Sequence, residues 1–401
     1  MRAGVRASGR ARRPWLVAAS MAAAAAAVLV AACGGGGSTV VDTGAAQAGG
    51  WTWTLPAGFP VPKVPDDNPM SVAKVDLGRH LFYDQRLSGN GTQACAGCHR
   101  QSRAFTDGRA VAVGSTGEAH PRNAQHLSNA AYHATITWAN PSLVTLERQA
   151  ETPLFGEQPV EMGVNDGNRD AVLQRLRDDP AYPARFAAAY PGEPSPIHWT
   201  NVIKALAAFQ RTLISGNSLY DRWLQGRATL TPAQERAKNL FFGERAECFH
   251  CHGSFNFNDQ IVHAASRIVE TPFHNTGLYN IDGKGGFPEP NRGVFELTAR
   301  AADMGMFRAP SLRNVEVTAP YFHDGTATTL EEVVRIYAAG GRHITSGPFA
   351  GDGRASPLKS DLITLIQLDG QEQADLVEFL KTLTDHEFLS DPRHADPFAA
   401  R

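Results

Sequence analysis

The chain has 401 residues, of which 42% are hydrophobic and 19% charged, and its formal net charge at pH 7 is −2. This composition excludes a disulfide-stapled miniprotein and a disordered chain, and the near-neutral charge argues against a protein that binds nucleic acid. The length allows two or three domains. The cysteine count is five, and an odd number is not what a disulfide framework alone would need.

The first 32 residues are predicted to be an export signal. Their basic segment carries five arginines and no acidic residue, and an alanine-rich run from Trp15 to Val30 follows. That run is shorter than a membrane span and has the length of a signal sequence. It ends in Val30-Ala31-Ala32-Cys33, which resembles the bacterial lipoprotein box, where the cysteine is lipidated and becomes the new N-terminus. The alternative is ordinary cleavage after a small residue, with Cys33 lost or free.

The export signal predicts a periplasmic protein, and lipidation of Cys33 would anchor it to a membrane through this residue. Residues 33–50 are rich in glycine and are expected to form a flexible tether between the anchor and the folded part of the chain.

Two Cys-x-x-Cys-His motifs stand at residues 95–99 and 248–252. Two thiols three residues apart can reach the two vinyl groups of one haem edge, and the next histidine can place its imidazole under the iron. A zinc ribbon would need cysteine pairs about 15–20 residues apart, whereas these pairs are 153 residues apart. A thioredoxin-like site would not need the histidine in both copies. We therefore predict two covalently attached haems, held by the following residues: Cys95, Cys98 and His99, and Cys248, Cys251 and His252.

The second half of the chain repeats the first. Helix-forming segments precede both motifs, at 77–83 and 236–242, and Leu127-Ser128-Asn129 reappears as Leu312-Arg313-Asn314. Apolar residues at helical spacing predict further helices at 202–214 and 371–383. The expected fold is mainly α, with two cytochrome-c-like haem domains and extended loops. The N-terminal domain is expected at 51–225 and the C-terminal domain at 226–401.

The repeat also predicts that the two haems differ. Thr145-Leu146-Glu147 matches Thr329-Leu330-Glu331 at an offset of 184 residues, and the same offset places Pro153 opposite Tyr337. A proline side chain cannot ligate iron, whereas a tyrosine can. The haem on His99 is expected to have an open distal face that binds peroxide, and the haem on His252 to be closed by Tyr337 and to exchange electrons. The alternative is that Tyr337 only packs against neighbouring valines of a helix.

Several longer strings resemble the MauG and bacterial dihaem cytochrome c peroxidase superfamily over nearly all of the mature chain. They are LGRHLFYDQRLSGNGTQACAGCH (77–99), AFTDG (104–108), LERQA (146–150), PVEMG (159–163), FHCHG (249–253) and APSLRNVEVTAPYFHDG (309–325). Four further strings resemble the MbnH-like group, whose members work beside a copper-binding partner protein. These are WTLPAGFPVPKVPDDNPMS (53–71), GSTGEAHPRN (114–123), TWANP (137–141) and FNFND (255–259).

The resemblance implies roles for matching positions. Tyr337 stands where dihaem peroxidases have a methionine ligand and MauG-like members a tyrosine, so it is expected to ligate the second iron. Glu161 and Gln149 match the distal polar pair, with Glu161 moving protons during peroxide cleavage and Gln149 donating a positioning hydrogen bond. Pro153 is expected on the open face. Trp138 matches the tryptophan that relays an electron hole between the haems.

Two further sets of positions follow from the resemblance. Asn123, Thr318 and Pro320 match residues that hold a calcium ion between the domains, through one side-chain oxygen and two backbone carbonyls. Some dihaem peroxidases have an additional histidine ligand on the first haem. None of three candidates lies at the family's usual interval, and we expect all three to be non-ligands: His120, His126 and His133.

The implied function is that of a dihaem oxidoreductase that reacts with hydrogen peroxide and stores two oxidising equivalents in a high-valent dihaem state. It would oxidise a residue of a periplasmic partner protein by long-range electron transfer, and tryptophan on a copper-binding partner is the inferred substrate. Two alternatives are open. One is a cytochrome c peroxidase that reduces peroxide to water with electrons from a cytochrome c or cupredoxin. The other is a non-enzymatic dihaem electron carrier.

Overall fold

A computed structural model of the protein describes residues 38–41 and 50–399. The predicted export signal (1–32), Cys33 and most of the predicted tether lie outside the described residues. Four residues of that tether form the strand β1 (Ser38–Val41), which pairs antiparallel with β2 (Trp53–Pro56). In the described residues, no helix is both long enough and apolar enough to cross a bilayer.

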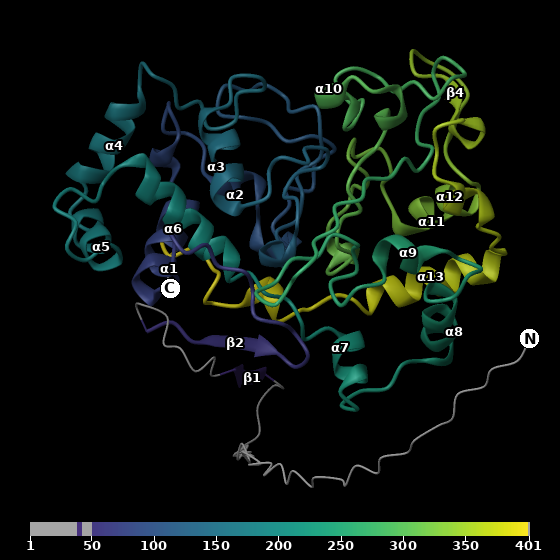
Figure 1. The fold of residues 1–401 in the computed structure, drawn as a ribbon, viewed down its shortest axis with the longest axis horizontal. Coiled ribbons are helices and arrows are strands. Elements are labelled where there is room, and N and C mark those ends of the chain that lie inside the picture. The colour runs from purple at the N-terminus through teal and green to yellow at the C-terminus, as the bar shows by residue number, and fades with distance from the viewer. Residues whose placement is uncertain (1–37, 42–49, 400–401) are drawn as a thin grey trace, which may run out of the picture. The chain divides into compact units, whose positions relative to one another are not determined.

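The described chain is mainly helical, as the sequence predicts, with long irregular loops between the helices (Figure 1). A second short sheet pairs β3 (His343–Ile344) with β4 (Gly351–Asp352). The helices are α1 (Val72–Tyr83), α2 (Cys95–Cys98), α3 (Leu146–Phe155), α4 (Arg169–Asp178), α5 (Tyr182–Ala189), α6 (Trp199–Arg211), α7 (Leu219–Leu224), α8 (Pro232–Phe241), α9 (Cys248–His252), α10 (Phe295–Thr298), α11 (Leu330–Ala338), α12 (Asp361–Leu365) and α13 (Gly370–Lys381).

Helix starts follow local capping chemistry. The hydroxyl of Thr231 accepts a hydrogen bond from the backbone N–H of Gln234 and begins α8, with Pro232 as the first helical residue. Asp369 and Glu372 form a capping box at the start of α13. The helices predicted at 202–214 and 371–383 are α6 and α13, displaced by one to three residues.

The repeat in the sequence is a repeat in space. In the first half α1 packs against α6, and in the second half α8 packs against α13. Asn129 and Asn314 both adopt a left-handed conformation, with φ of 60° and 61°. The Asn129 N–H donates to Leu213 O after α6 (2.8 Å), and the Asn314 N–H donates to Leu383 O after α13 (3.0 Å). The matching strings therefore occupy equivalent places in the two halves.

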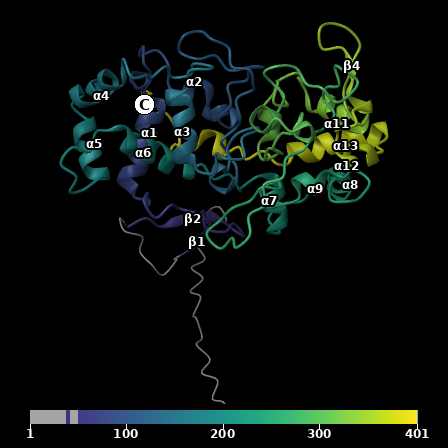
Figure 2. The ribbon, with the colours of Figure 1, turned by 45° about the horizontal axis from the view of Figure 1, so that its top comes forward.

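Each half has its own hydrophobic core, but the end of the chain crosses between them. Phe82 and Phe209 are buried in the first core, and Phe241 and Phe379 in the second. After α13 the chain returns to the first half (Figures 1 and 2), where the ring of Phe388 packs 5.7 Å from the ring of Phe105. The C-terminal segment of the predicted second domain thus helps to build the first core.

A buried polar network joins the halves. The side-chain amide of Asn129 donates to Asn256 Oδ1 (2.9 Å), and that of Asn314 donates to the hydroxyls of Ser128 (2.9 Å) and Ser215 (3.0 Å). All these side chains are buried. Loss of one partner would leave a buried polar group without its hydrogen bond, and the cost of removing that group from water would then destabilise the fold. The network therefore fixes the position of each asparagine turn.

An ion pair between Arg313 and Asp221 lies beside this network. Its two hydrogen bonds measure 2.9 and 3.1 Å, and the side chains are only 2% and 4% exposed. Burial by itself would raise the pKa of Asp221, but the pairing with Arg313 and hydrogen bonds from Ser218 outweigh burial and lower it. The pair is therefore charged over the whole physiological pH range.

We predict that Asp221→Asn destabilises the haem-loaded protein by about 3–5 kcal/mol at pH 7, because it leaves the Arg313 guanidinium buried without a counter-charge. Urea unfolding followed by circular dichroism measures this change. The carboxylate stabilises the fold above its unfolded-state pKa of about 3.9 and loses that effect as pH falls through the lower folded-state pKa. The difference between the proteins should thus shrink in acid.

The matched control is Asp166→Asn, which breaks an ion pair with Arg169. The Asp166 side chain in that pair is 98% exposed. Its effect should be no more than about 1 kcal/mol. Equal effects of the two substitutions would contradict the assignment of the buried pair.

Candidate active site

The first motif lies on the wall of a cavity in the N-terminal half. Helix α2 places Cys95 and Cys98 at this wall, together with His99. The ring Nδ1 of His99 donates to Phe105 O (2.7 Å), and Phe105 presents that carbonyl because its φ is 67°. The bond leaves Nε2 as the lone-pair nitrogen, and burial lowers the pKa of His99, which favours the neutral ring that binds metals.

The second motif is built in the same way. Helix α9 carries Cys248, Cys251 and His252 at the wall of a cavity in the C-terminal half. The ring Nδ1 of His252 donates to Phe257 O (2.9 Å), and Phe257 has a φ of 53°. Burial again lowers the pKa of the motif histidine. All four motif thiols are free to bond to another group.

Buried Arg308 indicates what else the cavities can hold. Its backbone N–H donates to Trp138 O (2.8 Å), and its guanidinium contacts the side chain of Gln125 in the wall of the first cavity. Burial lowers the pKa of Arg308 to about 10, so it remains a cation at neutral pH. Its Nη1 is buried and makes no hydrogen bond within the described residues. A carboxylate would satisfy this nitrogen, and haem carries two propionates, so the residues present fit a c-type haem.

The first cavity gathers the residues predicted for peroxide chemistry. Gln149 and Pro153 lie one turn apart on α3, and Glu161 lies on the loop that follows the helix; all three line the cavity with His99. The loop is tied to α3 by a hydrogen bond from Met162 N–H to Pro153 O (2.9 Å). Residues that are far apart in the sequence of the first half thus line the same cavity.

The second cavity has a tyrosine at the equivalent helical position. Tyr337 lies on α11 and lines the cavity that holds His252. Within the described chain its hydroxyl makes no hydrogen bond, and burial raises its pKa above the usual range. Thr329 caps α11 as Thr145 caps α3, so the helices that carry Tyr337 and Pro153 begin in the same way.

Trp138 belongs to both cavities. It lines the first and the second, and its indole N–H donates to Asn123 O (2.8 Å). The Asn123 N–H in turn donates to His323 O (2.7 Å), on the loop that follows Thr318 and Pro320. The segments of the expected calcium ligands are therefore in contact, while calcium itself stays a prediction.

A family description and several relatives place the chain. Residues 72–229 match the family described as di-haem cytochrome c peroxidase. Cytochrome-c peroxidase IdrP1 of Denitromonas iodatirespirans is 36% identical over 377 residues, which cover 89% of this chain and 93% of that protein. The chain belongs to the di-haem cytochrome c peroxidase family. Membership implies two c-type haems and a peroxide-dependent oxidoreductase.

The family includes proteins with two kinds of name. MauG of Methylorubrum extorquens is 33% identical over 328 residues, or 82% of each chain. A solved structure described as a MauG-like protein associated with microbial copper homeostasis is 57% identical and has a TM-score of 0.86. It covers 87% of this chain and all of its own. The di-haem peroxidase BthA of Burkholderia thailandensis, at 21% identity and a TM-score of 0.62, shares the fold.

The structure separates the three histidines that the sequence analysis treated together. The His126 ring bonds to Ser311 O (2.8 Å), and His126 and His133 are buried away from the walls of both cavities. His120 instead lines the first cavity, and its Nε2 is 3.5 Å from Glu161 Oε1. Its interval from His99 gave no indication of this contact.

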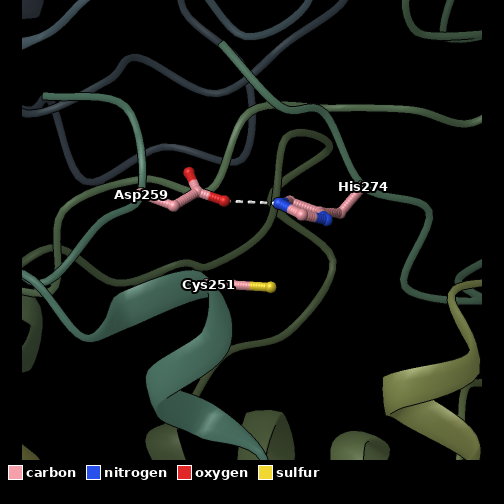
Figure 3. A group of neighbouring side chains, drawn as sticks. All are labelled: Cys251, Asp259 and His274. Atoms are coloured by element: carbon pink, nitrogen blue, oxygen red, sulfur yellow. Dashed lines mark hydrogen bonds and ion pairs between the residues drawn. The ribbon is translucent and has the colours of Figure 1, made fainter. Parts of the chain in front are cut away.

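A second group that the sequence analysis missed is an ion pair beside the second haem motif. His274 Nε2 and Asp259 Oδ2 are 2.5 Å apart, and the Cys251 sulfur on α9 points toward them (Figure 3). Burial would lower the pKa of His274, but Asp259 and Cys251 outweigh burial and raise it to about 10. Cys251 is a predicted haem-attachment residue, so we assign these three side chains to the surroundings of the second haem.

Replacing one cysteine pair by alanine should remove one haem and leave the other. Haem attachment needs both thiols of a motif, and the two motifs lie in different cavities. Pyridine haemochrome analysis and intact mass should show one haem per chain in Cys95→Ala/Cys98→Ala, and likewise in Cys248→Ala/Cys251→Ala. The residual spectra of the two variants should differ. A variant that keeps two covalently bound haems would contradict the assignment.

Proposed function

We propose that the protein uses hydrogen peroxide to oxidise a tryptophan side chain of a partner protein. The observation that carries the proposal is the difference between two otherwise equivalent cavities: Pro153 stands at the helical position where the other cavity has Tyr337. When bound, the two haem irons supply the reaction with peroxide and hold the oxidising equivalents. Each peroxide takes up two electrons and two protons and becomes two waters, and the partner residue loses the two electrons.

In the first cavity, the protein's own residues handle protons. Glu161 accepts the proton of the incoming peroxide and returns it to the leaving oxygen, which is the work of a general acid–base group. Gln149 donates a hydrogen bond that orients the peroxide. Pro153 offers no ligand atom and would leave a haem held by His99 accessible to the substrate.

In the second cavity, which Tyr337 and His252 both line, Tyr337 would offer its phenol oxygen to the iron of a haem held by His252. Oxygen ligation stabilises oxidised iron, whereas methionine raises the reduction potential. The methionines nearest in sequence that could compete as the iron ligand are Met304 and Met306. They precede the TAPYFHDG string (318–325), whereas Tyr337 follows it on α11, where the family has its ligand. The site is thereby suited to retain oxidising equivalents until a partner residue is reached.

Trp138 relays electrons between the two cavities. Its ring lines both of them, and its N–H is held by the neutral carbonyl of Asn123 (2.8 Å). A carbonyl is a weak proton acceptor, so the indole can lose and regain an electron while it keeps its proton. The relay therefore needs no proton exit route.

The proposal extends to the partner and the location. A relative at 57% identity is described as associated with microbial copper homeostasis, which supports a copper-binding, periplasmic partner protein. Export by the 1–32 signal and a lipid anchor on Cys33 would hold the enzyme beside that partner. A calcium ion on Asn123, Thr318 and Pro320 would stabilise the contact around Trp138, and the Asn123 side-chain oxygen accepts no hydrogen bond within the described residues.

A cytochrome c peroxidase activity is the second candidate. The relative IdrP1, at 36% identity, carries that name. In this case a cytochrome c or a cupredoxin would supply the two electrons, and the enzyme would have to be partly reduced before peroxide could react.

The two candidates separate in one experiment. Peroxide added to the fully oxidised, haem-loaded protein should give a stable two-electron-oxidised form without prior reduction, seen in its visible spectrum. Tyr337→Met should change the ligation spectrum of the second haem and shorten the lifetime of that form. Tyr321→Phe removes a hydroxyl from the same cavity and should leave both properties unchanged. A strict need for half-reduction before any reaction would favour the ordinary peroxidase.

The role of Glu161 has its own test. Glu161→Gln removes the proton acceptor while keeping the shape of the side chain, and the second-order rate constant with peroxide should fall about 10²-fold or more, as measured by stopped-flow absorbance. Glu157→Gln is the control, because Glu157 is an exposed residue just after α3. Equal rates for wild type and Glu161→Gln would remove Glu161 from the acid–base role.

A further inference from the structure

We propose that His120 is a positioning residue for the peroxide reaction, which holds the Glu161 carboxylate directed into the first cavity. The inference rests on the proposed function, in which Glu161 takes the peroxide proton. Both side chains line the cavity. They are 27% and 33% exposed, and His120 Nε2 lies 3.5 Å from Glu161 Oε1.

The tautomer of His120 follows from its other nitrogen. The backbone N–H of Arg122 donates to His120 Nδ1 (3.1 Å), so Nδ1 accepts and the ring proton is on Nε2. Nε2–H is thus the atom that faces the carboxylate. Because Nδ1 is occupied by a backbone donor, the ring presents Nε2–H to the Glu161 carboxylate at a distance of 3.5 Å.

The loop around His120 is anchored on both sides. The His120 N–H donates to Ala112 O (2.8 Å), which closes a turn over residues 112–120. On the other side, the Arg122 guanidinium pairs with Glu296 (2.6 Å) in the second half of the chain. The backbone on both sides of the ring is therefore held, by the turn on one side and by the second half of the chain on the other.

The Glu161 loop lies directly against that turn. The Ser115 N–H donates to Glu161 O (2.7 Å), and the Glu118 carboxylate accepts from Val160 N–H (3.1 Å). These contacts fix the backbone of Glu161 but not its carboxylate. Among the described residues, no side chain donates a hydrogen bond to that carboxylate, and His120 is the one donor within ion-pair distance. The direction of the carboxylate thus depends on His120.

Fixing the carboxylate matters for the rate. A glutamate side chain that rotates freely spends little time in the orientation that accepts a proton from a bound peroxide. The His120 ring, whose Nε2 lies 3.5 Å from Glu161 Oε1, restricts that rotation. His120 thereby keeps Glu161 ready as a base. His120 itself need not touch the peroxide.

A double-mutant cycle tests the inference on the haem-loaded protein. His120→Ala should lower the second-order rate constant with peroxide about tenfold, and His120→Gln, which keeps a donor, should recover most of the loss. In the Glu161→Gln background, His120→Ala should cause no further loss, because the group through which it acts is gone. A purely structural role would slow both backgrounds equally.

A matched control uses another histidine–glutamate pair. His198 Nε2 lies 2.6 Å from Glu193 Oε1 at the start of α6, outside both cavities. His198→Ala should leave the rate constant unchanged. Haem content and the resting spectrum of each variant show whether the haem sites are intact, and His120→Gln keeps the test valid if His120→Ala folds poorly.

The outcomes separate this inference from the proposed function. If Glu161→Gln slows the reaction but His120→Ala does not, the inference on His120 is wrong and the role of Glu161 stands. If Glu161→Gln has no effect, the proposed role of Glu161 fails, and the inference fails with it. A resting low-spin spectrum that becomes high-spin in His120→Ala would identify His120 as an iron ligand and overturn its positioning role.

Discussion

Both cavities depend on one hydrogen bond, from ring Nδ1 of the motif histidine to the carbonyl of a left-handed phenylalanine. In the first half it joins His99 to Phe105, and in the second His252 to Phe257. A bulky residue with positive φ costs about 1–3 kcal/mol, and burial of the phenylalanine ring in the core of its half offsets this strain. The bond sets the tautomer and orientation of the imidazole before any metal arrives, so the packing of each core determines where the iron ligand points.

Both halves contain this histidine–phenylalanine hydrogen bond, but they differ at one helical position in the cavity wall. Pro153 and Tyr337 each stand eight residues after a threonine cap, on α3 and α11. Each position lines the cavity that also holds the motif histidine of its own half. Under the proposed function, a change at this position would alter the ligands available to one haem while the other haem site keeps its own.

Local patterns in the sequence predicted the motifs, the repeat, α6 and α13, because each depends on neighbouring residues. Contacts made by irregular loops could not be predicted in this way. His120 was judged by its interval to His99, yet its partner Glu161 lies 41 residues further along the chain on another loop. The return of Phe388 to the first core is equally invisible in a local pattern, because no periodicity encodes which half a C-terminal loop will pack against.

The contacts that hold the halves together also hold Trp138, the proposed electron relay. Trp138 is fixed through its N–H by Asn123 and through its carbonyl by Arg308. Asn123 donates its backbone N–H to His323 O in the second half, and Arg308, which also belongs to the second half, donates its backbone N–H to Trp138 O. Both residues that hold Trp138 are therefore tied to the second half. Any loosening of the interface would therefore change the position of the relay as well as the stability of the fold. Since electron transfer falls steeply with distance, the buried polar contacts between the halves are as much a requirement of the chemistry as of folding.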